Sequence, residues 1–94
     1  MVLVNKIINA KKAARETAAR KLELFEYHVD GVNNKINEAI HNGFSFTEYN
    51  QINTDATGVR EQVMEFYKNL GYEVWVSYDG FVALSWEEND VNKS

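Results

Sequence analysis

The chain contains no cysteine and no proline, and only five of its 94 residues are glycine. Without cysteine, neither disulfide bonds nor thiolate metal sites can stabilise it. Because proline is absent, Gly31 is the only helix-breaking residue in 3–42. If helical throughout, such a stretch spans about 60 Å at about 1.5 Å per residue, which is long for a chain of this size.

Long hydrophobic runs are also missing. No apolar run approaches the roughly 18 residues of a membrane span, and the short apolar start precedes basic residues, the reverse of a signal peptide. We therefore expect a cytoplasmic protein without membrane contact. The length fits a single domain over residues 1–94, which we divide into a long helix (1–43, basic at its start), a body (44–86) and an acidic tail (87–94).

Apolar residues in the first half recur with alternating spacings of three and four, as in a heptad repeat. They are Leu22, Phe25, Val29, Val32, Ile36 and Ala39, and the same register continued backwards meets Ala18, Arg15, Lys11, Ile8 and Val4. The stripe keeps its phase across Gly31, which favours one helix ending at Gly43 over two helices joined by a turn. A stripe this long needs a partner surface, so we interpret its apolar half as a dimer seam and expect a homodimer.

Alternating apolar and polar residues in 44–47 predict a short strand. A second helix follows, capped by Thr54, Asp55 or Thr57 and ended by Gly71. Its expected buried stripe is Val59, Val63, Phe66 and Leu70, widened by Met64 and Tyr67.

The segment from Gly71 to Trp86 predicts a hairpin with Asp79-Gly80 as a two-residue type I′ turn. One face would then carry the pairs Tyr78–Phe81, Val76–Ala83 and Val74–Ser85, and the other Trp75–Leu84, Ser77–Val82 and Glu73–Trp86. Both faces are largely apolar, so we expect the second helix to cover one and the long helix or a second subunit to cover the other. The predicted fold is α+β with a small antiparallel sheet.

No residue pattern indicates catalysis. His28 and His41 show no metal-ligand spacing and are expected to be surface or capping residues, and phosphate-binding glycine loops are absent. We expect no enzymatic activity, no cofactor, no metal and no small-molecule substrate.

Charge is distributed unevenly along the chain. Residues 1–21 hold six basic side chains and one acid, whereas residues 22–94 hold four basic side chains and thirteen acids. The basic start can follow nucleic acid phosphates or pair with acidic neighbours. The acidic residues of the body either provide solubility or present a surface to a basic protein. The candidate acidic face consists of Glu38, Glu48, Asp55, Glu61, Glu65, Glu73, Asp79, Glu87, Glu88 and Asp90.

Three segments, "INEAIHNGF", a helix ending "LGYEVWV" and a hairpin closing "ALSW", carry a resemblance over residues 36–86. In this combination the chain resembles small phage-encoded α+β proteins, and its acidity and size are similar to those of host-takeover proteins of lytic phages of Gram-positive bacteria. The resemblance implies a homodimer in the host cytoplasm that inhibits DNA binding by the nucleoid protein HU through mimicry of DNA. The basic first helix departs from a simple mimic, which leaves open whether the whole surface or only the body imitates DNA.

Two alternatives stand beside this interpretation. One is a phage virion or assembly component that oligomerises through the long helix. The other is an accessory protein that binds DNA through its basic first helix, although we expect no direct DNA binding from the preferred interpretation.

Overall fold

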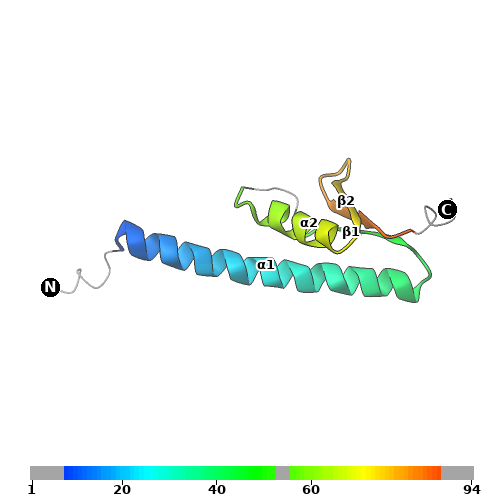
Figure 1. Ribbon diagram of the computed structural model, residues 1–94, viewed down its shortest axis with the longest axis horizontal. Helices are drawn as coiled ribbons and strands as arrows, with labels where there is room; N and C mark the ends of the chain where they lie inside the picture. The colour runs from blue at the N-terminus through cyan, green and yellow to red at the C-terminus, as the bar shows by residue number, and fades with distance from the viewer. Residues whose placement is uncertain (1–7, 53–55, 88–94) are drawn as a thin grey trace.

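A computed structural model describes residues 8–52 and 56–87 of the chain. Its elements are α1 (Ala10–His41), β1 (Phe46–Tyr49), α2 (Val59–Asn69), β2 (Glu73–Val76) and β3 (Val82–Ser85). Figure 1 shows α2 and the sheet lying together against one side of α1. The α+β fold predicted from the sequence is therefore confirmed.

Helix α1 runs without interruption through Gly31, as the phase of its apolar stripe predicted. The side chain of Asn9 caps its first turn by accepting a hydrogen bond of 2.8 Å from the backbone N–H of Lys12. At the other end Gly43 adopts a positive φ of 84°, and the N–H of Phe44 donates to the carbonyl of Ala39 at 2.8 Å. This C-terminal motif ends the helix where the sequence predicted its stop.

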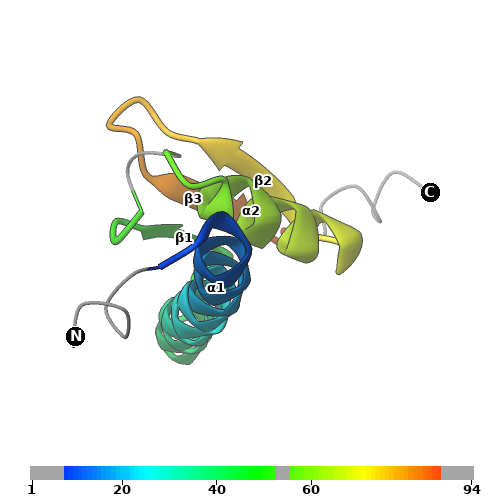
Figure 2. The ribbon, with the colours of Figure 1, turned by 90° about the vertical axis from the view of Figure 1, so that its left-hand side faces the viewer.

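The three strands form an antiparallel sheet in the order β1-β3-β2. One face packs against both helices, with α1 contacting β1 and α2 contacting β2 (Figure 2). The core between these layers contains Val32 and Ile36 of α1, Val63 and Tyr67 of α2, and Leu84 of the sheet. The long helix and the second helix of the same chain thus cover a single face of the sheet, which we call the inner face.

The hairpin register differs by one residue from the predicted one. Val74 pairs with Leu84 and Trp75 with Ala83, while Ser77 donates its N–H to the carbonyl of Phe81 at 2.8 Å. The loop therefore has three residues, 78–80, ending in Gly80 at a positive φ of 88°. Three-residue hairpin loops place glycine in this way, and they compete with the two-residue turn for the same Asp-Gly sequence.

This one-residue difference overturns the prediction that both hairpin faces are largely apolar. A shift of one residue moves every side chain of a strand to the opposite face. Val74, Val82 and Leu84 now share the inner face, whereas Trp75 lies with Ala83 on the opposite side, which we call the outer face. Neither helix covers the outer face, because both contact the inner one.

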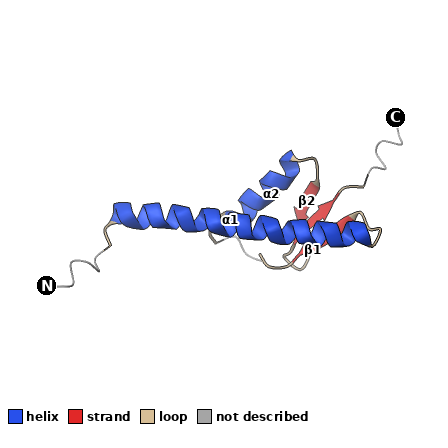
Figure 3. Cartoon of the chain, turned by 90° about the horizontal axis from the view of Figure 1, so that it is seen from below, coloured by secondary structure: helices blue, strands red, loops and turns tan. Residues whose placement is uncertain are grey.

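The buried stripe of α2 also differs from the prediction in part. Val59, Val63, Met64 and Tyr67 are buried, but Phe66 is 38% exposed and Leu70 is 60% exposed. The apolar positions spaced by four residues face the sheet, and α2 crosses α1 obliquely (Figure 3).

The start of α2 agrees with only part of the predicted cap. Its N-cap residue is Gly58, and the hydroxyl of Thr57 accepts a hydrogen bond of 3.3 Å from the N–H of Val59. Thr54 and Asp55, the other predicted capping residues, lie outside the described residues.

The molecule is elongated, with extents of 70 × 25 × 22 Å and a radius of gyration of 18.0 Å. A compact domain of this length has a radius of gyration of roughly 12 Å. The difference arises from the first third of α1, residues 10–21, which projects beyond the body and contributes no residue to the core. We call this segment the arm. Despite its length, α1 is too polar to cross a membrane, and α2 is too short.

Candidate functional site

The outer face of the sheet carries an exposed pair of aromatic rings. Phe46 of β1 and Trp75 of β2 approach each other over the central strand, with ring centroids 6.0 Å apart and planes inclined by 31°. Phe46 is 45% exposed and Trp75 is 41% exposed. The two residues stand diagonally across β3, because Trp75 is paired with Ala83 and Phe46 with Ser85, and Ala83 is fully buried.

Two carboxylates flank this aromatic pair. Glu48 stands opposite Ala83 on β1, and Glu73 stands opposite Ser85 on β2, so both belong to the outer face. Neither forms an ion pair with a basic side chain of the described residues. Aromatic faces and carboxylates both attract guanidinium and ammonium groups, so this face suits basic side chains of a partner.

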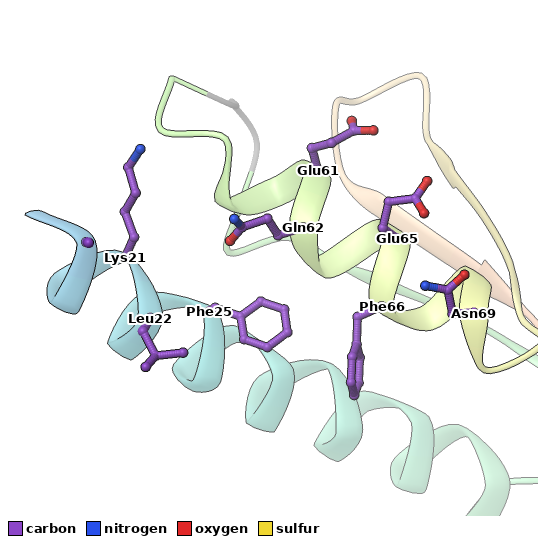
Figure 4. Close-up of a pocket in the computed structure, with 9 residues that line it drawn as sticks. Lys21, Leu22, Phe25, Glu61, Gln62, Glu65, Phe66 and Asn69 are labelled. Atoms are coloured by element: carbon purple, nitrogen blue, oxygen red, sulfur yellow. The ribbon is translucent and has the colours of Figure 1, made fainter.

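A second surface is a groove of about 640 Å³ between residues 18–25 of α1 and residues 61–69 of α2 (Figure 4). Its floor is formed by Leu22, Phe25 and Phe66, and the rings of Phe25 and Phe66 meet edge to face at 5.6 Å. Glu61 and Glu65 of α2 stand along the rim. Lys21 of α1 also lines the groove, which thus combines an apolar floor with an acidic rim on its α2 side.

The structure divides the predicted acidic face into separate groups. Glu48 and Glu73 lie on the outer face of the sheet, and Glu61 and Glu65 lie on the rim of the groove. Asp79 is exposed at the hairpin tip and Glu87 is exposed after β3, while Glu38 sits near the end of α1 and pairs with Lys35 at 3.7 Å. Asp55, Glu88 and Asp90 lie outside the described residues.

The chain's own body occupies half of the predicted dimer seam. Val32, Ile36 and Ala39 are at most 6% exposed, and Val29 and Phe25 are partly buried against the same core. Leu22, in contrast, is 58% exposed. The homodimer remains a prediction, and the surface of α1 still open to a second chain begins at Phe25 and runs towards the N-terminus.

Two partly buried polar contacts that the sequence did not reveal join α1 to the body. The Nδ1 atom of His28 lies 2.7 Å from the hydroxyl of Tyr49, and the hydroxyl of Tyr67 donates to Asn33 Oδ1 at 2.6 Å. Burial lowers the pKa of His28 and raises the pKa values of Tyr49 and Tyr67 to about 12, so burial favours the neutral form of all three. His28 is therefore an inter-element contact rather than the predicted surface residue.

No known protein family, curated protein or solved structure matches this chain. Within residues 8–52 and 56–87, no three histidine or carboxylate side chains come together in a way that could hold a metal ion. The two surfaces above, one aromatic and acidic and the other apolar with an acidic rim, therefore carry the functional argument.

Proposed function

We propose that this chain is a non-enzymatic binding protein that occupies the nucleic-acid-binding surface of a basic protein such as HU. The supporting observation is the outer face of the sheet, where an exposed aromatic pair lies between Glu48 and Glu73, two carboxylates that form no ion pair within residues 8–52 and 56–87. A DNA-binding protein presents lysine and arginine side chains. These can form ion pairs with the carboxylates of the outer face and cation–π contacts with its aromatic rings.

The charge of the body favours such a partner. Residues 44–86 contain six acidic side chains and two basic ones. Carboxylates fixed on a rigid sheet and helix can stand in for phosphates, and the excess of one sign accelerates encounter with a basic protein. Each exposed charge pair contributes roughly 0.2–1 kcal/mol, so affinity arises from several pairs together and weakens as salt is added.

A gel-shift competition tests the proposal. The chain is added to a preformed HU–DNA complex at low salt, and we expect DNA to be released. The variant Glu48→Gln/Glu73→Gln should require about tenfold more protein for the same release, since two charges are lost from the contact. Glu38→Gln, which removes a carboxylate already paired with Lys35, is the matched control and should behave as the wild type.

If wild-type chain leaves the HU–DNA complex intact at low salt, the proposal is wrong for HU. If release occurs but the double variant releases DNA as well as the wild type, the outer face is not the contact surface.

The projecting arm favours a second candidate, a phage assembly component that oligomerises through α1. Such a protein forms rings or fibres, whereas the binding protein forms a discrete small oligomer, and sizing separates the two. Lys11 and Arg15 are exposed on the arm. If the chain instead shifts DNA by itself, with a salt slope that falls when these residues are replaced, it is a DNA-binding accessory protein.

A further inference from the structure

We propose that two copies of this chain pair through antiparallel α1 helices, with the arm of each copy seated in the acidic-rimmed groove of the other. The groove adjoins the arm, whose Ala18 and Lys21 also line it, and the α2 side of the groove has the opposite charge to the arm. This pairing concerns self-association and does not depend on the identity of any other partner.

The arm is a helix without a supporting surface. Residues 13–23 are all exposed, and of residues 8–12 only Lys12 is partly covered. A helix of about twelve residues is marginal in water unless tertiary contacts support it. The arm is rich in alanine, at positions 10, 13, 14, 18 and 19, and small side chains let a second helix approach closely.

The groove provides an apolar surface on which the arm of a second copy can pack. Leu22 and Phe66 expose apolar surface on its floor, at 58% and 38%. Its rim is acidic through Glu61 and Glu65, whereas the arm carries Lys11 and Arg15 as exposed cations. The negative charge of the rim therefore complements the positive charge of the arm, and the apolar floor can cover apolar surface of the arm.

The spacing of the stripe allows an antiparallel register that brings the arm of one copy to the groove of the other. Within α1, Lys11, Arg15, Ala18 and Leu22 follow one another at intervals of 4, 3 and 4 residues, a series that reads the same in both directions. A two-fold axis between Glu16 and Thr17 therefore brings each stripe residue opposite another stripe residue.

In this register Lys11 of one copy meets Leu22 of the other beside the acidic rim. Ile8 precedes the helix N-cap Asn9, so it lies just beyond the helical part of the stripe, on the side of Phe25 of the other copy. Ile8 is 57% exposed in the single chain, so the pairing covers apolar surface at both ends of the stripe. The two-fold symmetry makes every contact twice.

Charge reversal tests the pairing. Lys11→Glu/Arg15→Glu removes the net positive charge of the arm and places two carboxylates beside the acidic rim of the groove. Glu61→Lys/Glu65→Lys gives a basic groove beside a basic arm. By sedimentation equilibrium at low salt, without any partner, each variant should dimerise about tenfold more weakly than the wild type or worse. An equimolar mixture should recover the dimer, because each arm then meets a groove of opposite charge. All four substitutions are at exposed positions, and circular dichroism checks that the fold persists.

Cysteine pairing tests the register in a chain that has no cysteine of its own. Leu22→Cys and Lys11→Cys should form a mixed disulfide when combined under mild oxidation, while Leu22→Cys combined with Asn37→Cys should not. Self-crosslinking of Leu22→Cys alone would indicate a parallel dimer and overturn the register.

A wild-type chain that stays monomeric at its highest soluble concentration would overturn the pairing itself. So would charge-reversed variants that dimerise as strongly as the wild type. Neither result bears on the HU competition, in which the tested carboxylates are Glu48 and Glu73.

Discussion

Gly31 is the residue that allows the body to approach α1. A Cβ atom at this position would lie 2.6 Å from Cε1 and 2.7 Å from the hydroxyl oxygen of Tyr49. Glycine in a helix interior costs about 1 kcal/mol relative to alanine. Here it makes room for a buried tyrosine ring that continues to His28 through a hydrogen bond of 2.7 Å.

We therefore expect Gly31→Ala to destabilise the protein by about 1–3 kcal/mol, since a buried clash outweighs the gain in helix propensity. Urea unfolding followed by circular dichroism measures the change. Asn34→Ala, at an exposed position of the same helix, is the control and should leave stability unchanged or slightly higher. A Gly31→Ala variant more stable than the wild type would show that the Tyr49 ring moves aside without cost.

The sequence could predict that α1 continues through Gly31, because the apolar residues before and after this position keep the same helical spacing. It could not predict why glycine stands there, since the contact with Tyr49 joins residues eighteen positions apart and leaves no local pattern. His28 was misjudged for the same reason, because its partner is also Tyr49.

At the scale of elements, the hairpin shows how one loop residue decides which side chains face solvent. Asp79-Gly80 is compatible with a two-residue turn and with the three-residue loop observed. The apolar content of both strands gave no reason to prefer either register. The strands, their order along the chain and their antiparallel pairing were predictable, whereas the assignment of Trp75 to an exposed face was not.

Paired substitutions on the hairpin test this assignment. Leu84→Ala should cost about 2–5 kcal/mol, because Leu84 is fully buried in the core. Trp75→Ala should cost less, about 1–2 kcal/mol, although tryptophan is larger, because its ring is 41% exposed and packs mainly on Phe46. Chemical denaturation of both variants provides the comparison, and a larger cost for Trp75→Ala would contradict the observed register.

For the candidate sites too, some features could be predicted from the local sequence, whereas others depend on contacts between residues far apart in the chain. Exposure of the carboxylates followed from composition, because the apolar positions already fill the core. Their separation into Glu48 with Glu73 and Glu61 with Glu65 depends on the sheet register and on the packing of α2, which no local pattern specifies. The groove depends on Phe66, which the sequence placed in the core.

At the scale of the whole molecule, the fold and the arm are separable. The core and the apolar residues packed against it begin at Leu24 and end at Trp86. A chain shortened to start at Lys21 should therefore keep its cooperative unfolding and lose no more than about 1 kcal/mol of stability, because exposed helical residues contribute little.

Thermal unfolding and small-angle scattering of the shortened chain test this separation. The radius of gyration of the monomer should fall below the 18.0 Å of the intact chain. Loss of a cooperative transition would show that the arm supports the body within one chain.

The separation of arm and core has a consequence for how the sequence can change over generations. Substitutions in the arm carry little folding cost, so its charge and length can change almost free of selection for stability. Substitutions at Val32, Tyr67 or Leu84 are constrained by the core in every copy. Among divergent descendants we expect the body to stay recognisable while the sequence of the arm changes. Under the proposed pairing, specificity for the second copy can then change without a change of fold.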